Sequence, residues 1–355
     1  MGAYIVRRLL LVVPTLFGII AINFAIVQFA PGGPVEQMIA ELKGRGDISS
    51  RLTGARSDFG NAGSYRGARG LDPAIVADIR QMFGFDKPPL TRFRDMISGY
   101  LRFDFGRSFF RDRTVWQLLL QRMPVSISLG LWSTLLVYGI SIPLGIAKAV
   151  RHGSRFDVAT SAIVLVGYAV PGFLLAILLV VVLAGGGFVH WFPLSGLVTE
   201  GASEWPWPAR AMDYLWHMVL PTVAMVVGGF AGLTMLTKNC FLEEIGKQYT
   251  VTARAKGASE QRVLYGHMFR NAMLLIVAGF PQALISILFT SALLVEIVFS
   301  LDGLGLLGFQ AAIQRDYPVM FGTLYLFTLA GLLMQIVGDL MYTLVDPRID
   351  FEARS

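Results

Sequence analysis

Residues 9–30, LLLVVPTLFGIIAINFAIVQFA, decide the class of this protein. At about 1.5 Å rise per residue, a run of this length crosses roughly 30 Å of hydrocarbon as a helix. Five further runs of similar length and composition follow it. The six predicted spans are 9–30, 126–148, 159–184, 217–237, 272–298 and 319–345. The sequence therefore predicts an all-α polytopic membrane protein with six transmembrane helices.

The composition agrees with this class, because 54% of the 355 residues are hydrophobic and only 15% are charged. The first run follows Arg7 and Arg8, as a secretory signal would, but it is too long for a signal and QFAPGGP lacks an A-x-A cleavage pattern. We interpret it as an uncleaved span. Cys240 is the single cysteine, which excludes an intrachain disulfide, and four scattered histidines predict no metal site.

The Lys and Arg residues predict the orientation of the chain. Its two ends and the loops after the second and fourth spans carry 13 of the 30, whereas the two short loops on the opposite side carry only Arg210 and Arg315. The other 15 lie in residues 31–125, a long translocated region that the positive-inside rule largely exempts. We therefore expect both termini, including the tail 346–355, to be cytoplasmic.

Residues 31–125 are predicted to form an extracytoplasmic region between the first two spans. Within it, residues 40–70 are rich in Gly, Ser and charge and are expected to be a flexible insert, and residues 71–122 are expected to be partly helical. In LDPAIVADIRQMFG, residues 71–84, Asp72 can cap a helix, Pro73 can open it and Gly84 can stop it.

A second helix is predicted near the end of this region. Thr114 and Gln117 have the spacing of a capping box. Trp116 and the neighbouring leucines lie between Arg113 and Arg122, a pattern typical of a helix at the membrane interface. The five remaining spans form a predicted transmembrane core over residues 126–345.

The loop 238–271 is the longest polar interruption in that core. Phe241, Ile245 and Tyr249 recur every four residues, and Glu243 and Lys247 can pair at i,i+4. We therefore expect an amphipathic helix on the inner membrane surface, followed by a sharp turn and a second helix that continues into the fifth span.

The turn itself is TARAKGASE, residues 252–260. Gly257 is placed to end the first helix, and Ser259 with Glu260 to cap the second. Its small side chains let another surface approach the backbone closely, and Arg254 and Lys256 add charge for orientation. A plain solvated loop would carry the same residues, so spacing alone leaves docking and solvation both open.

A transporter needs an energy source, and the chain contains no G-x-x-x-x-G-K-[ST] loop for ATP; IGKQ at 245–248 lacks the required residues. An ion-coupled carrier acting alone is the main alternative, and it would rely on Glu296 and Asp339, the few ionisable residues of the late spans. A membrane-embedded enzyme would need clustered His or Asp residues, which the sequence does not contain.

Motifs along nearly the whole chain resemble one family, the inner-membrane permeases of binding-protein-dependent ABC importers, in their dipeptide/oligopeptide/nickel branch. They are YIVRRLLLVVPTLFGIIAINFAIVQFAPGGP, FGFDKPP, FDFGRSF, WFPLSG, TARAKGASEQRVLYGHMFRNA, VEIVFSLDGLG, RDYPVMFGTLYLFT and DLMYTLVDPRI, in family order. The likeness is greatest to the Yej-type subgroup. It implies a type I ABC importer permease fold and import of oligopeptides, including the peptide-nucleotide antibiotic microcin C.

The resemblance also implies roles for particular residues. In this family the loop after the fourth span carries the EAA motif, which forms the coupling helix seated in the ATPase. The residues carried over are Thr252, Ala253, Arg254, Ala255, Lys256, Gly257, Ala258, Ser259 and Glu260. The general motif has Glu where this chain has Val251, and Ala where it has Thr252. Glu296 matches a Glu of the branch, as a gate or a structural residue, and Asp302 replaces a usual Pro on the outer face.

The implied partners follow from the same family. They are a second permease subunit, a cytoplasmic ATPase with two nucleotide-binding domains that hold ATP and Mg, an extracytoplasmic peptide-binding protein, the peptide and membrane lipid. The chain itself is expected to bind no cofactor, metal or nucleic acid and to catalyse no reaction. The implied location is the bacterial inner membrane.

Overall fold

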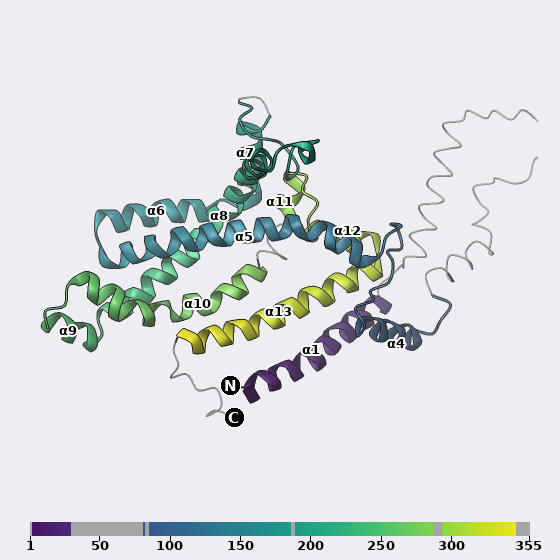
Figure 1. Ribbon diagram of the computed structural model, residues 1–355, viewed down its shortest axis with the longest axis horizontal. Helices are drawn as coiled ribbons and strands as arrows, with labels where there is room; N and C mark the ends of the chain where they lie inside the picture. The colour runs from purple at the N-terminus through teal and green to yellow at the C-terminus, as the bar shows by residue number, and fades with distance from the viewer. Residues whose placement is uncertain (1, 30–80, 82–84, 186–188, 287–292, 346–355) are drawn as a thin grey trace, which may run out of the picture. The chain divides into compact units, whose positions relative to one another are not determined.

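The computed structural model describes residues 2–29, 81, 85–185, 189–286 and 293–345, and every regular element within these ranges is a helix (Figure 1). A π-helical segment, Arg262–Met268, leads into α10. The labelled helices are α1 (Gly2–Phe29), α4 (Pro89–Tyr100), α5 (Val115–Val150), α6 (Arg155–Ala169), α7 (Gly172–Leu183), α8 (Trp207–Ile245), α9 (Gln248–Ala255), α10 (Phe269–Ser286), α11 (Leu293–Val298), α12 (Leu304–Gln314) and α13 (Tyr317–Val345).

The all-α class with six predicted spans is confirmed within the described ranges. Five helices are long and apolar enough to cross a membrane: α1, α5, α8, Arg262–Ile285 and α13. The sixth candidate is the pair α6 and α7, which is bent by 89°. Our prediction of one continuous helix over 159–184 is therefore wrong. Val170 adopts an extended conformation before Pro171, because a residue that precedes proline avoids the helical region and proline has no N–H to donate.

Two other helices differ from the sequence prediction at their ends. The capping box is confirmed, since the Thr114 and Gln117 backbone N–H groups donate to each other's side chains at 3.1 and 3.2 Å. The prediction of a separate interfacial helix is wrong, because the helix that starts there is α5 itself.

The prediction of one amphipathic helix that carries Phe241, Ile245 and Tyr249 on a single stripe is also wrong. The helix α8 ends at Ile245, and Tyr249 belongs to α9.

Several predictions fall outside the described residues. They are the insert 40–70, the tail 346–355 and, except for Gln81, the helix expected over 71–84. The predicted span 272–298 is described as α10 and α11, and residues 287–292 between them lie outside the description.

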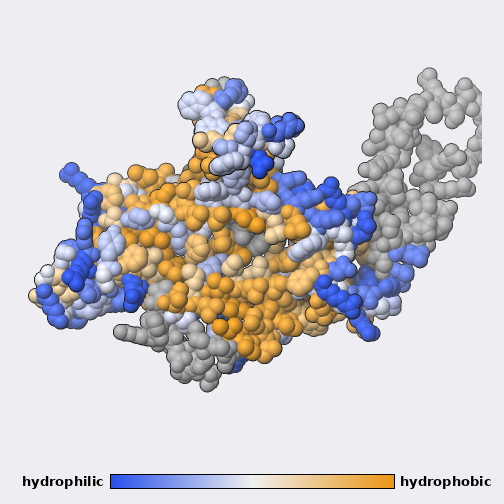
Figure 2. Space-filling view, in the orientation of Figure 1, coloured by the Kyte–Doolittle hydropathy of each residue, from blue (hydrophilic) through white to orange (hydrophobic). Residues whose placement is uncertain are grey.

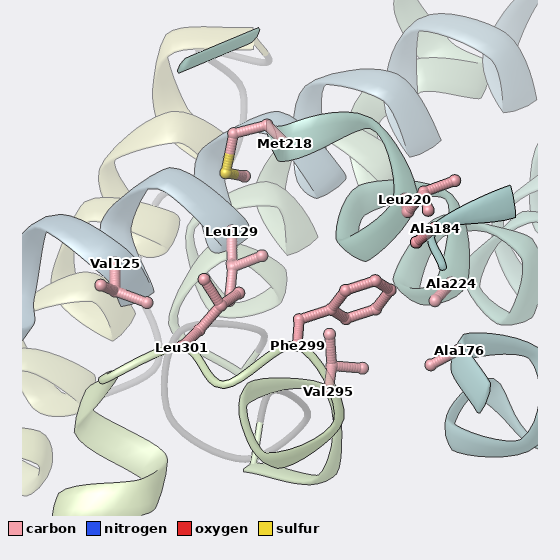
Figure 3. Close-up of a cluster of buried hydrophobic side chains, with 10 residues drawn as sticks. All are labelled: Val125, Leu129, Ala176, Ala184, Met218, Leu220, Ala224, Val295, Phe299 and Leu301. Atoms are coloured by element: carbon pink, nitrogen blue, oxygen red, sulfur yellow. The ribbon is translucent and has the colours of Figure 1, made fainter. Parts of the chain in front are cut away.

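The packing divides the chain into two compact units. The first contains Met1–Val12, Gln121–Leu307 and Phe327–Ser355. One of its cores joins Val125 and Leu129 of α5 to Ala224 of α8 and Phe299 after α11 (Figure 3). A second core packs α5, α8 and α10 around the fully buried Phe241.

Small residues bring α5 and α8 into close contact within this first unit. A Cβ on Gly145 of α5 would lie 2.6 Å from the Thr237 Cβ and 2.8 Å from the Thr234 carbonyl oxygen. Interfaces between membrane helices favour such residues, because the backbones can then approach closely.

The second unit contains Val13–Leu120 and Gly308–Leu326. Aromatic rings fill its interior: the ring centroid of Phe105 lies 5.1 Å from Tyr100 and 5.5 Å from Tyr325. Asp316 is buried there; it accepts hydrogen bonds from the Ser108 hydroxyl and, at 3.1 Å, from the Phe109 N–H. Burial raises the pKa of this carboxyl.

The surface has the character of a membrane protein. Hydrophobic side chains spread over the long helices, whereas hydrophilic side chains gather around α9 (Figure 2). Leu10 on α1 and Ile163 on α6 are 68% and 71% exposed. Apolar surface of this extent is expected where lipid, not water, is the solvent.

Candidate coupling surface

The corner between α8 and α9 is held by one buried carboxylate. Lys247 lies 3.4 Å from the Glu243 Oε1, so the predicted pair is present, but its nearer partner is the Glu244 Oε1 at 2.5 Å. The Tyr249 hydroxyl also donates to Glu244. The hydrogen bond to Glu244 raises the pKa of Lys247. These contacts fix the direction in which α9 leaves the end of α8.

Gly257 ends α9 as predicted. Its φ is +85°, a conformation that other residues adopt only with strain. The Ala258 N–H donates to the Ala253 carbonyl at 3.1 Å, and the Gly257 N–H to the Arg254 carbonyl at 2.8 Å. This pair of bonds is the Schellman motif, which satisfies the last carbonyls of a helix.

The two predicted caps of the next helix have different outcomes. The Ser259 Oγ accepts from the Arg262 N–H at 3.4 Å, so Ser259 caps that helix. Glu260 does not cap it; its two carboxylate oxygens accept from the Arg254 Nε and Nη2 at 2.9 and 3.2 Å. An exposed pair of this kind adds little stability, but its forked geometry joins the two sides of the turn.

The nine residues 252–260 present a small, mostly exposed surface. Ala253, Arg254 and Ala258 are half-buried, and the other six are exposed. Val251 stands beside them with 53% of its side chain exposed, so it has no place in the core. The position where the family's general motif has Glu is thus an outward-facing apolar residue. ATPase coupling by these nine residues stays a prediction.

Buried side chains connect this surface to the spans. Thr250 of α9 is fully buried, and its hydroxyl lies 2.9 Å from the Ile245 carbonyl and 2.6 Å from that of Lys247. On the other side of the turn, Val263 and Met268 of the π-helical segment are buried. The turn is therefore packed against both helices that flank it.

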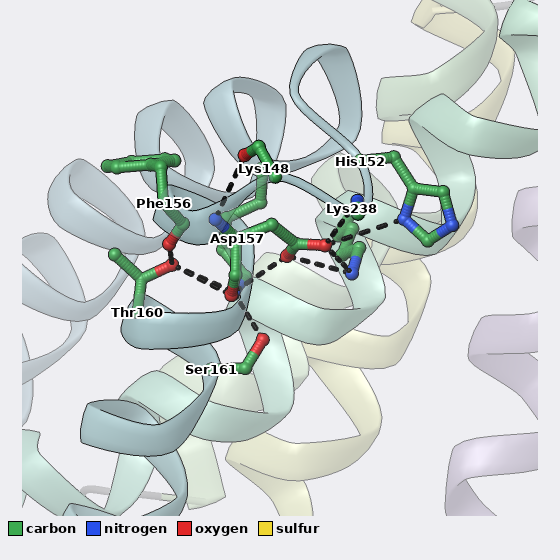
Figure 4. A network of polar contacts seen from close by, with 9 residues as sticks. Lys148, His152, Phe156, Asp157, Thr160, Ser161 and Lys238 are labelled. Atoms are coloured by element: carbon green, nitrogen blue, oxygen red, sulfur yellow. Dashed lines mark hydrogen bonds and ion pairs between the residues drawn. The ribbon is translucent and has the colours of Figure 1, made fainter.

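A buried ionic cluster joins α5, α6 and α8 (Figure 4). Asp157 lies 3.1 Å from the Lys148 Nζ and 2.8 Å from the Lys238 Nζ, and at most 8% of any of the three residues is exposed. Lys148 also donates to the hydroxyls of Thr160 and Ser161, at 3.0 and 2.6 Å. Two of the basic residues that predict the orientation are thus buried and paired. Breaking one pair would leave a buried charge uncompensated, so the cluster holds the three helices together.

Glu296 accepts hydrogen bonds at the start of α12. It is fully buried; its Oε2 accepts from the Leu306 N–H at 2.7 Å and its Oε1 from the Ser126 hydroxyl at 3.2 Å. The Ser126 oxygen in turn accepts from the Leu304 N–H at 2.8 Å. A Cβ on Gly303 would lie 2.7 Å from the Glu296 Oε2. This geometry gives Glu296 a structural role in the first turn of α12, where an anion is favoured.

The other outer and intramembrane acids also have partners. Asp302 is exposed and lies 2.5 Å from the Arg122 Nη1 of α5. Asp339 of α13 lies 3.3 Å from the Arg8 Nη2 and accepts from the Tyr4 hydroxyl at 2.9 Å. Sequence reasoning missed the partners Ser126, Arg122 and Arg8, because they are remote in the chain and no motif marks them.

A cavity of about 630 Å³ lies in the first unit between α5, α7, α8, α10 and α11. Its lining is mostly apolar and includes Gly228 and Gly229, with Thr134 and Tyr138 as polar members. Among the described residues, no group of three or more His, Cys, Asp or Glu side chains is placed to hold a metal ion.

Comparison with known proteins places these features in a family. Residues 141–351 match the family model of the binding-protein-dependent transport system inner membrane component. The chain is 58% identical over 364 residues to the inner membrane ABC transporter permease protein YejB of Escherichia coli O157:H7, and 56% identical over 362 residues to the peptidoglycan transport system permease protein YejB of Agrobacterium fabrum, with all of each chain covered. It is 31% identical to the oligopeptide transport system permease protein AppB of Bacillus subtilis, over 99% of this chain and 100% of that protein.

Proposed function

The chain belongs to the family of binding-protein-dependent transport system inner membrane components, and from this premise we propose that it is a permease subunit of an ATP-driven importer for oligopeptides. The observation that supports the coupling role is the exposed turn of small residues at 252–260. Gly257 and the Arg254–Glu260 pair fix its shape.

The proposed energy source is a separate ATPase with two nucleotide-binding domains, which hold ATP and Mg. The ATPase receives the turn, and the buried contacts of Thr250, Val263 and Met268 transmit its movement to α8 and α10. The cluster around Asp157 then carries it to α5 and α6. Packed helices move as rigid units in such transitions, so the spans alternate access to the two sides of the membrane.

The rest of the proposal concerns substrate, partners and orientation. Relatives named for oligopeptide, dipeptide and peptidoglycan transport support a peptide substrate. Microcin C-like conjugates are included on the resemblance of the sequence alone. A second permease completes the pathway, an extracytoplasmic binding protein delivers the peptide, and both termini face the cytoplasm of a bacterial cell.

The main alternative, an ion-coupled carrier acting alone, requires acids that can exchange protons. Glu296 is engaged by Ser126 and the first turn of α12, and Asp339 by Tyr4 and Arg8. Both carboxylates thus have structural partners, which favours the ATP-driven mechanism.

The test is Gly257→Asp in the complex purified with its partner subunits and reconstituted in proteoliposomes. We expect normal membrane insertion, loss of ATP-driven peptide uptake and weaker co-purification of the ATPase. Gly201→Asp is the matched control, because Gly201 also has a positive φ, +83°, and open space at its Cβ, but lies in the loop before α8. Unchanged uptake and ATPase binding in the Gly257 variant would overturn the proposal. So would peptide uptake by the purified chain alone under a proton gradient without ATP.

A further inference from the structure

A pocket of about 360 Å³ lies within the second unit. It is formed by the last turns of α1, by α4 and the segments beside it, and by the first turns of α13. Seven aromatic rings line it: Phe24, Phe85, Tyr100, Phe105, Phe109, Tyr317 and Phe321.

Four charged side chains also line this pocket: Lys87, Arg92, Asp95 and Asp104. The Arg92 guanidinium lies 4.3 Å from the Phe85 ring centroid and donates to the Gln28 Oε1 at 2.7 Å. Its Nε is buried and has no hydrogen-bond partner within the described residues. Lys87 and Asp95 pair at 2.8 Å, and Asp104 accepts from the Gly106 N–H at 3.0 Å. The pocket thus offers two cations and two carboxylates.

The pocket lies at the ends of two predicted spans, α1 and α13, which places it at the depth of the membrane interface. In the turns of α1 that precede the pocket, the helix face that carries Phe24 is apolar and exposed: Val13 and Phe17 lie on it and are 62% and 51% exposed. A mixed aromatic and charged site next to a lipid-exposed helix is suited to a molecule with a polar head and an apolar tail.

We propose that this pocket binds the headgroup of a zwitterionic phospholipid, with phosphatidylethanolamine as the fitting type. The phosphate is held by the Arg92 guanidinium, which lines the pocket, since guanidinium groups suit phosphate oxygens. The ammonium faces Asp95 and Asp104 and the aromatic rings, which attract cations. The acyl chains follow the exposed face of α1. A peptide with charged ends would match the charges but would leave that face without a function.

The experiment measures lipid binding to the full-length chain, purified with its partner subunits and delipidated. Native mass spectrometry counts the phosphatidylethanolamine or phosphatidylglycerol retained from vesicles of each lipid. Arg92→Gln should weaken phosphatidylethanolamine binding about tenfold, the loss expected for one hydrogen bond to a charged group. Arg94→Gln is the matched control, because Arg94 is exposed on the same helix and does not line the pocket.

A second variant separates the proposal from a folding defect. Asp95→Asn lies on an exposed position, so the fold should be unaffected, and it should shift the preference from phosphatidylethanolamine toward the anionic phosphatidylglycerol. Soluble glycerophosphoethanolamine should fail to displace the lipid, because it lacks the acyl chains. Equal lipid retention by the Arg92 and Arg94 variants, an unchanged preference in the Asp95 variant, or displacement of the lipid by a tripeptide would each overturn the proposal.

Discussion

Replacing Gly303 by Ala should destabilise the protein through a single contact. The backbone of Gly303 lies outside the left-handed region, so alanine is allowed by its conformation. Its new Cβ, however, would lie 2.7 Å from the Glu296 Oε2 and closer still to the Oε1. The carboxylate must therefore leave a site in which it is fully buried.

The cost of this substitution has two parts. Overpacking a well-packed core costs about 1–3 kcal/mol. Loss of the 2.7 Å hydrogen bond from the Leu306 N–H to a charged acceptor adds about 1.5–3 kcal/mol. At about 2 °C per kcal/mol for a chain of this size, Tm should fall by roughly 5–12 °C.

The assay uses Cys240, which is half-buried on α8 and is the single cysteine of the chain. A fluorogenic maleimide reacts with it on unfolding and so reports Tm. Gly308→Ala is the control, since nothing lies within 4 Å of its Cβ and alanine favours a helix. In Gly303→Ala combined with Glu296→Ala the effects should be less than additive, because the carboxylate that the Cβ displaces is gone. A Tm for Gly303→Ala equal to that of Gly308→Ala would refute this reasoning.

Three further substitutions test other contacts, with the same Cys240 assay for the stability changes. Asp157→Asn should cost about 3–5 kcal/mol, because two buried lysines lose their counter-charge; a Tm equal to wild type would contradict the role of the cluster. Gly145→Val should separate α5 from α8 and lower ATP-driven uptake more than ATPase binding, and uptake at the wild-type level would exclude a transmission role for that contact. Arg122→Gln should change stability by less than about 1 kcal/mol, because its partner Asp302 is exposed, and a larger loss would show that this pair is stronger than its exposure implies.

The helical class and the turn at 252–260 could be predicted from the sequence because both depend on local signals. Hydrophobic length gives a span, and Gly257 with its small neighbours gives a helix stop whose hydrogen bonds are local. The capping box at Thr114 and Gln117 is of the same kind, since its two bonds join residues three apart.

The bend in the third span is marked locally by Pro171, but the continuous hydropathy of residues 159–184 favours a single helix. Pro171 and the residue before it mark the break, yet proline inside α5 and α8 leaves those helices continuous. A proline alone therefore does not separate a bent span from a straight one. The sequence also predicts a shorter span, 217–237, than the observed α8, Trp207–Ile245. The hydrophilic last turns of α8 are held by tertiary packing around Phe241, which cannot be predicted from hydropathy.

The polar partners could not be predicted, because they join residues that are far apart in the chain. Glu296 and Ser126 are 170 positions apart, and Lys238 and Asp157 are 81 apart. In one sequence each appears as an isolated polar residue, which favours a functional interpretation over a structural one. Only the folded structure shows the partner of each residue, and with it the structural role.

The π-helical segment Arg262–Met268 lies between the turn at 252–260 and α10. The orientation of the turn relative to α10 therefore depends on how many residues join them as well as on their types. A π-turn closes i→i+5 and holds one residue more than an α-helical turn. The π-turn absorbs this extra residue, so deleting one residue from the segment would restore α-helical geometry and leave the helix on its two sides in nearly the same register. Deleting one residue from α10 instead would rotate everything on its N-terminal side by about 100° about the helix axis. The surface at 252–260 would keep its own hydrogen bonds in both variants, so the pair separates the direction that this surface faces from its composition.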